Sequence, residues 1–203
     1  MITSMNELPA LTKLDVAQRE INAAIRLLFD GGDPVAVLVL AAAARGIVTA
    51  LCEKQGVRSF FDDLQEEFPD REKRDLYREA NKHANWFKHA NEDAEDVLEG
   101  VKAADADMIL FCATYDFGSV CKGKSIEAQV FEGWFLYQYG EEADVPSGLA
   151  ELFPKLRELP RAEQLALGKS VIEWARTQPG FQMTYSLEFR VVSPDPGATT
   201  SGS

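Results

Sequence analysis

The chain has 203 residues, of which 46% are apolar and 27% are charged, a composition typical of one soluble globular domain with a sizeable core. Its 33 acidic residues outnumber the 21 basic ones, so the formal net charge is −12. Such a field repels a bare phosphate backbone and excludes a general nucleic-acid coat protein, while a local basic pocket stays possible.

Three cysteines, Cys52, Cys112 and Cys121, have neither an even count nor the spacing of metal ligands. We therefore expect reduced thiols in a reducing compartment. The first residues lack a basic stretch followed by an apolar one, so no signal peptide is expected. The longest apolar run, residues 34–44, is too short to span a bilayer. Together these features predict a cytoplasmic protein without a membrane partner.

The first half of the chain predicts four helices. Apolar residues recur at helical spacing over residues 11–29, and the sequence DGGDP then ends the helix. Its Asp-Pro pair suits the start of the next helix, 34–54, which is apolar nearly all round and is therefore expected at the centre of the bundle. A short amphipathic helix over 59–68 and a longer one over about 70–89 complete this half.

The second half predicts a turn and one or two helices over residues 91–123, where the segment MILFCATY also has strand propensity. A helix over 125–140 carries an aromatic face. A last helix over 160–180 begins at a proline and ends before a glycine.

The spacing of apolar residues near the C-terminus changes from that of a helix to that of a strand. Over residues 181–192 apolar and polar residues alternate, which is typical of a half-buried strand. A lone strand needs a partner, so this segment is expected to be an extended arm on the helices or a strand exchanged within a dimer. Residues 193–203 are predicted to be disordered. The predicted fold is thus a mostly α-helical bundle of five to seven helices over residues 1–180, with one C-terminal strand or arm.

Both histidines lie in one predicted helix, within the stretch REANKHANWFKHANED. At about 100° per residue, His83 falls on the apolar stripe and His89 points about 120° away. A shared metal site is therefore disfavoured, and we expect neither a metal nor another cofactor. His83 is expected to be a histidine at the edge of the core.

His89 has two interpretations. It follows Asn85 by four residues and is adjacent to Lys88, so an amide could orient its imidazole for general acid–base chemistry beside a cation. Alternatively, the histidine and the lysine form an ordinary basic helix end ahead of an acidic turn.

The helix pair REINAAIRLLFDGGDPVAVLVLAAAARGIVTALCEKQG resembles the start of HEPN domains, small helical bundles of many bacterial toxins and defence proteins. Active members of that family carry an arginine, often followed by asparagine, with a histidine about five residues later, and act as metal-independent ribonucleases at a dimer interface. The run ANWFKHA is also similar to a motif of an uncharacterised bacterial group. The resemblance covers about residues 14–90.

Two registers of the family motif are possible. Arg78 and His83 have the required spacing, but a glutamate follows the arginine. Asn85 and His89 match the second half of the motif, but Ala84 stands at the arginine position.

The missing arginine leaves two hypotheses for the function, a binding protein and a ribonuclease. We expect a non-enzymatic HEPN-like protein that binds a partner, a nucleotide or its own copy, because Ala84 and the net charge argue against catalysis. The alternative is a metal-independent ribonuclease that uses His89 as the base and Asn85 to orient it. Its phosphate cation would be Lys88, Lys82 or Arg78, or a cation supplied by a dimer mate. Arg78 lies about 16 Å from His89 along the helix, too far to share a phosphate within one chain, and Lys82 lies closer. The expected partner is a second copy in a homodimer, and another protein or RNA is the alternative.

Overall fold

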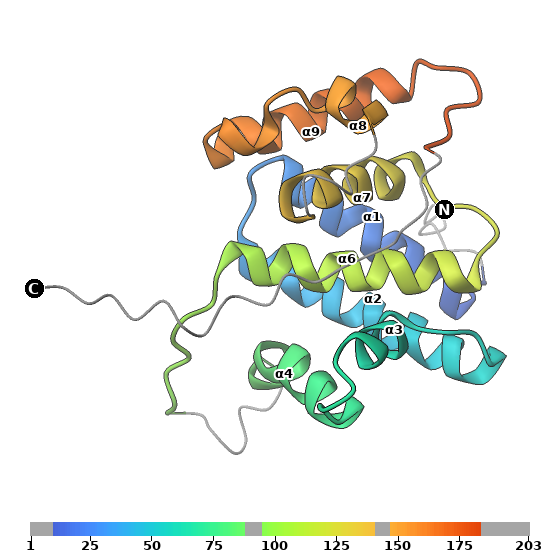
Figure 1. Cartoon of the computed structure of the whole chain (residues 1–203), viewed down its shortest axis with the longest axis vertical. Helices are drawn as coiled ribbons and strands as arrows, with labels where there is room; N and C mark the ends of the chain where they lie inside the picture. Colours follow the sequence, from blue (N-terminus) through green and yellow to red (C-terminus); the bar gives the residue numbers. More distant parts are fainter. Residues whose placement is uncertain (1–9, 88–94, 141–146, 184–203) are drawn as a thin grey trace, which may run out of the picture.

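The chain folds as a mostly α-helical bundle, as the sequence predicts. The computed structural model describes residues 10–87, 95–140 and 147–183. Within these ranges 72% of the chain is helical, with eight α-helices and no strand (Figure 1). Two of the helices are short, so six long helices form the body of the bundle.

The first two helices form an antiparallel hairpin. Helix α1 (Lys13–Phe29) begins at a capping box, in which Thr12 accepts a hydrogen bond from the backbone of Asp15 and Asp15 accepts one from the backbone of Thr12. Helix α2 (Pro34–Gln55) begins at Asp33, whose side chain accepts the backbone N–H of Val35 at 2.8 Å. These caps satisfy helix-end donors that would otherwise need water.

The remaining helices follow in chain order: α3 (Phe60–Glu67), α4 (Lys73–Trp86), α6 (Ala103–Val120), α7 (Ile126–Tyr139), α8 (Ser147–Leu152), the short 3₁₀ helix η2 (Leu156–Glu158) and α9 (Arg161–Ala175).

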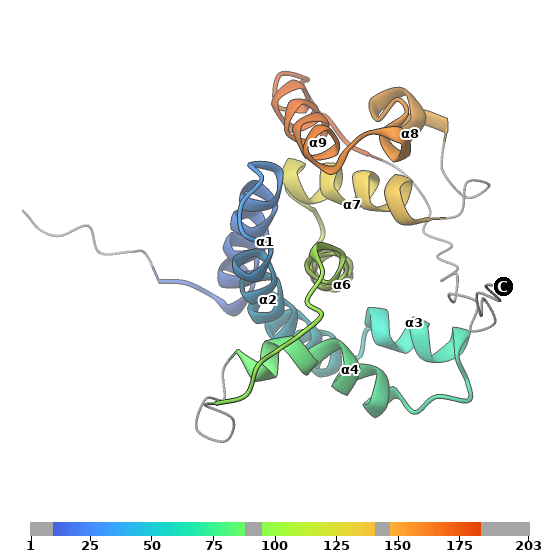
Figure 2. The same cartoon turned by 90° about the vertical axis from the view of Figure 1, so that its left-hand side faces the viewer.

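Helix α6, and not α2, occupies the middle of the bundle. Figure 2 shows α6 end-on, with α1 and α2 on one side, α7 to α9 above it and α3 with α4 below it. It packs against α1, α2, α3 and α7. The expectation of a central α2 is wrong, because one face of α2 is open to solvent, with Val35 42% and Val39 40% exposed.

The segment MILFCATY is entirely helical, within α6. The segment does not form a strand. Its side chains are apolar on nearly all sides of the helix, which fits a helix whose surface is mostly covered by neighbouring helices. Phe111 of this segment stacks on Phe135 of α7, with ring centroids 4.2 Å apart. On the aromatic face predicted for 125–140, Phe131, Trp134 and Phe135 are fully buried in the core, whereas Tyr139 is 37% exposed.

Residues 181–183 lie against α7. Residues 181–183 are irregular, and the backbone N–H of Met183 donates to the side-chain oxygen of Gln129 at 2.8 Å. The rest of the strand predicted over 181–192, and the tail 193–203, lie outside the described residues.

The contact between α9 and α1 requires a glycine. A Cβ at Gly168 would lie 2.3 Å from Cε1 of the Phe29 ring. We expect Gly168→Ala to lower the free energy of unfolding by about 1–3 kcal/mol, since the well-packed ring must move. Urea denaturation measures the effect. Gly148→Ala is the matched control, because a Cβ at Gly148 meets nothing within 4 Å, and equal stability of the two variants would contradict the packing argument.

Candidate functional site

A cleft of about 610 Å³ lies between helices α3 and α4 on one side and α6 on the other. We call it the α4–α6 cleft. Its volume is in the range of small-molecule sites. Its lining residues are Phe60, Phe61, Leu64, Phe68, Arg71, Leu76, Glu79, Ala80, Lys82, His83, Asp105, Met108, Ile109 and Cys112. The cleft therefore has an apolar, partly aromatic floor and a charged rim.

The aromatic floor is fixed by contacts to the core. Phe60 packs edge-on against Phe111 of α6, with centroids 5.8 Å apart. Phe61 stacks on Tyr77 of α4, with centroids 4.3 Å apart and planes inclined by 25°. Both rings come from the first turn of α3, so the position of that turn sets the shape of the cleft.

A buried carboxylate holds the first turn of α3 in place. Asp116 of α6 is fully buried and accepts the backbone N–H of Phe60 at 2.6 Å and the hydroxyl of Thr49 at 2.7 Å. The N-terminus of a helix attracts negative charge, which makes α3 a favourable partner. Burial nevertheless raises the pKa of Asp116 above its ordinary value, because it disfavours the charged form.

His83 lies at the rim of the cleft, half-buried, as expected for a histidine at the core edge. Its Nδ1 is 3.6 Å from Oδ2 of Asp105, the same oxygen that accepts the backbone N–H of Lys102 at 2.8 Å. The distance is longer than a good hydrogen bond. The carboxylate is therefore held by the start of α6 and faces the imidazole across the cleft edge.

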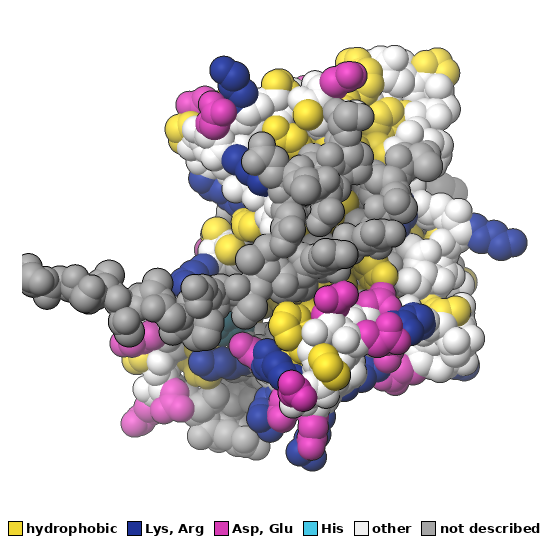
Figure 3. All heavy atoms as spheres, viewed as in Figure 1, with side chains coloured by type: hydrophobic (Ala, Val, Ile, Leu, Met, Phe, Trp, Pro, Cys, Tyr) yellow, Lys and Arg dark blue, Asp and Glu magenta, His cyan; other side chains and the backbone are white. Residues whose placement is uncertain are grey.

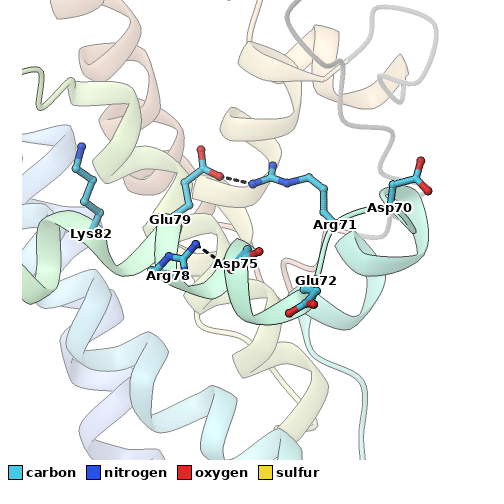
Figure 4. A pocket seen from close by; sticks show the side chains of 7 residues that line it. All are labelled: Asp70, Arg71, Glu72, Asp75, Arg78, Glu79 and Lys82. Atoms are coloured by element: carbon cyan, nitrogen blue, oxygen red, sulfur yellow. Dashed lines mark hydrogen bonds and ion pairs between the residues drawn. The ribbon is translucent and has the colours of Figure 1, made fainter.

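Arg78 lies in a different depression. A broad hollow of about 720 Å³ runs along the outer face of α4, and its lining residues are Asp70, Arg71, Glu72, Asp75, Arg78, Glu79 and Lys82 (Figure 4). Arg78 pairs there with Asp75 at 2.9 Å. Arg78 lines this hollow and His83 lines the cleft, and the two depressions adjoin through Arg71, Glu79 and Lys82, which line both.

The other residues of the motif are only partly described. Asn85 is exposed near the end of α4, and Ala84 is buried. Lys88 and His89, central to the catalytic hypothesis, lie outside the described residues.

The rim carries both signs of charge. Figure 3 shows basic and acidic side chains interspersed over the region of α3 and α4. Arg71 pairs with Glu79 at 2.6 Å. Lys82, in contrast, has no ion-pair partner in the part of the chain that the structure describes, and Figure 4 shows it extending away from the other residues of the hollow.

Arg45, like Asp116, was not singled out by the sequence pattern. It lies on the inner side of α2, only 3% exposed, and its guanidinium carbon is 5.4 Å from the centroid of the Phe61 ring, a cation–π distance. One of its nitrogens donates to Asn81 of α4. Its Nε and its other terminal nitrogen have no hydrogen-bond partner among the described residues. A buried positive charge therefore lies directly behind the cleft floor.

The buried cysteines are not suited to nucleophilic chemistry. Burial raises the pKa of both Cys52 and Cys112 to about 12, so both thiols stay protonated near neutral pH. Within the described ranges no group of three or more His, Cys, Asp or Glu side chains is placed to hold a metal ion.

Comparisons with known proteins give no relative. No family model matches the sequence, and no curated protein and no solved structure matches it significantly.

The role of Asp116 can be tested by two substitutions. Asp116→Ala leaves the Phe60 N–H and the Thr49 hydroxyl buried without an acceptor, so we expect it to lower the free energy of unfolding by about 2–4 kcal/mol. Asp116→Asn keeps an acceptor oxygen and is expected to lose much less. Chemical denaturation of both variants beside the unmodified protein measures the difference, and equal losses would contradict the hydrogen-bonding role.

The same carboxyl predicts a pH dependence. Its folded pKa is raised above the unfolded value, so the folded state binds the proton more tightly. The stabilisation from this proton is present below the unfolded pKa and is lost as the pH rises through the folded pKa. The stability difference between Asp116→Asn and the unmodified protein should therefore shift in favour of the variant as the pH rises through that interval. A difference that is constant with pH would show that Asp116 does not titrate as described.

Proposed function

We propose that this chain is a non-enzymatic, HEPN-like helical protein that binds a nucleotide in the α4–α6 cleft. The observation that carries the proposal is the combination, in one cleft of about 610 Å³, of an aromatic floor with a rim of mixed charge in which Lys82 has no ion-pair partner among the described residues. The family assignment itself rests on the helix pair and the short motif of the sequence.

The floor suits a planar base. Phe60, Phe61 and Phe68 line the cleft together with Leu76 and Ile109. Aromatic side chains bind nucleobases by stacking, which is worth about 1–3 kcal/mol per base and tolerates any base. Phe60 and Phe61 are buried against Phe111 and Tyr77 and give the cleft an apolar wall, so the half-buried Phe68 is the ring that offers a stacking surface.

The rim suits a phosphate. Lys82 lines the cleft without an ion-pair partner in the described ranges, so binding an anion there breaks no existing pair. Arg71 lies on the same rim and shares its charge with Glu79. A single phosphate beside Lys82 is compatible with the acidic surface of the whole protein, because the interaction is local and close-range.

Substitution of Lys82 tests the phosphate site. We expect Lys82→Ala to weaken the binding of adenosine or guanosine monophosphate about ten- to hundredfold, since it removes a charge-assisted hydrogen bond. Isothermal titration calorimetry measures the affinity. Lys13→Ala is the control, because Lys13 is exposed at the start of α1 and does not line the cleft.

A second variant fills the cleft. Met108 lines it from α6 and is half-buried, so Met108→Trp should abolish nucleotide binding by occupying the base site while circular dichroism stays unchanged. If no nucleotide of a purine and pyrimidine panel raises the melting temperature of the unmodified protein, the proposal is wrong.

The ribonuclease is the second candidate, and the pair of His83 and Asp105 favours it. The imidazole of His83 lies 3.6 Å from the carboxylate of Asp105 at the edge of the cleft, and closing this gap to hydrogen-bond distance on substrate binding would orient it as a general base. In this reading His83 replaces or assists the predicted base His89, and Lys82 replaces Lys88 as the cation near the phosphate.

RNA cleavage in the presence of EDTA decides between the candidates. Loss of cleavage in His89→Ala alone supports the predicted base, and loss in His83→Ala alone supports the base at the cleft. Absence of cleavage in the unmodified protein, across structured and unstructured RNAs, removes the ribonuclease. The nucleotide-binding measurements do not depend on this result.

A further inference from the structure

Helix α2 carries one charged residue between Pro34 and Cys52, and this residue, Arg45, is buried in the bundle and only 3% exposed. The helix is otherwise apolar enough, by length and composition, to cross a membrane, although half of the relevant window is buried inside the bundle. No carboxylate among the described residues forms an ion pair with Arg45. A buried cation without a counter-charge is costly in a protein interior, so its position calls for a partner that the described residues do not supply.

The polar side chains around Arg45 do not compensate its charge. The side-chain oxygen of Asn81 on α4 accepts a hydrogen bond from Nη2 of Arg45, but the amide is neutral. The amide nitrogen donates to the backbone carbonyl of Tyr77 at 2.8 Å, which holds the oxygen toward the arginine. Asp116 acts on Arg45 at a distance, and its two oxygens accept the hydrogen bonds from α3 and α2 described above.

The free nitrogens of Arg45 lie on the two edges of the guanidinium that bind oxyanions. On each edge two nitrogens can donate to the two oxygens of one carboxylate or phosphate. Nη2 belongs to both edges, Nε completes one of them, and Nη1 completes the other. The Asn81 oxygen takes the shared nitrogen, while Nε and Nη1 have no acceptor among the described residues. The ring of Phe61, 5.4 Å from the guanidinium carbon, attracts the charge but fills neither edge.

We propose that Arg45 binds a small oxyanion, a phosphate or a carboxylate group, which displaces the Asn81 amide and bonds one edge of the guanidinium with two oxygens. A water molecule satisfies the same donors, but an anion also cancels the buried charge. The oxyanion approaches from the α4–α6 cleft, because Phe61, which lies against the guanidinium, is one of the residues that line it. Helix α4, which carries Asn81, packs mainly against α3 and α2, so a shift of this one helix opens the way.

This inference does not rest on the proposed nucleotide site. Lys82, the cation expected to bind the nucleotide phosphate, is exposed and lines the cleft, whereas Arg45 is buried and is not a lining residue. The two cations can therefore be substituted separately. The oxyanion at Arg45 also replaces a hydrogen bond between α2 and α4, so its binding is coupled to the position of the helix that forms one wall of the cleft.

Titration with phosphate and with acetate, each at constant ionic strength, tests the site. We expect at least one of them to raise the melting temperature of the unmodified protein. Arg45→Met should weaken its binding, measured by calorimetry, about tenfold or more, since the charge-assisted hydrogen bonds are lost, while circular dichroism stays unchanged because methionine fills a similar volume without a charge. Arg19→Met is the matched control, because Arg19 is exposed on α1. A rise no larger than that from chloride, or one that Arg45→Met retains, would overturn the proposal.

Two substitutions of Asn81 test the displacement in opposite directions. Asn81→Ala removes the competing acceptor, so the oxyanion should bind about ten times more tightly. Asn81→Asp supplies a carboxylate of the same size from within the chain, so binding of the oxyanion should be lost while circular dichroism stays unchanged. Equal affinity of both variants and the unmodified protein would show that the amide is not displaced, and would contradict the proposal.

Lys82→Ala distinguishes this site from the rim of the cleft. We expect this variant to bind the oxyanion as the unmodified protein does. Loss of binding in Lys82→Ala, with binding retained in Arg45→Met, would place the anion at the rim and overturn the inference while supporting the nucleotide phosphate site. Binding lost only in Arg45→Met supports the inference even if no nucleotide binds, so the two proposals fail separately. A greater affinity for phosphate than for acetate assigns the site to phosphate groups, and the reverse order assigns it to carboxylates.

Discussion

The buried carboxylate of Asp116 determines where helix α3 begins, and the candidate site depends on that position. A charge in the core is costly unless donors compensate it. Here the donors are the first amide of α3 and the hydroxyl of Thr49 from α2. One side chain of α6 thus connects three helices, and Phe60 and Phe61 form the floor of the α4–α6 cleft as a consequence of this anchoring.

A second buried charge connects α4 to the bundle. Arg45 bonds Asn81 and lies against Phe61, which in turn stacks on Tyr77. Helix α4 packs mainly against α3 and α2, so this polar and aromatic contact is a large part of what positions it. Arg45 also favours the charged form of Asp116 at a distance, although burial is the stronger influence and the pKa of that carboxyl stays raised. The two walls of the cleft are therefore linked through one buried electrostatic environment.

Local signals predicted the helices well and their arrangement poorly. The Asp-Pro pair of Asp33 and Pro34 acts within a few residues, so the start of α2 was readable. The sequence did not show that α6, and not α2, is the central helix. Both helices are apolar nearly all round, and only the packing of the other helices decides which of the two is covered. The strand propensity of residues 108–115 yielded to the same packing.

The site was harder to predict than the fold. His83 lies at the core edge, as its place on the apolar stripe indicated, but its neighbour Asp105 comes from another helix. Asp116 and Thr49 are separated by 67 positions, and a single polar residue in an apolar helix does not identify its partner. The same is true of Arg45 and Asn81, 36 positions apart. Contacts of this kind arise from the tertiary fold alone.

The reactivity of the Cys112 thiol reports on opening of the α4–α6 cleft. The thiol is fully buried at the floor, where burial raises its pKa to about 12. An alkylating reagent can reach it only when α3 and α4 separate from α6, and only its small thiolate fraction reacts. The alkylation rate therefore follows the frequency of local opening, and a compound that occupies the cleft would slow it whether or not that compound is ever chemically transformed.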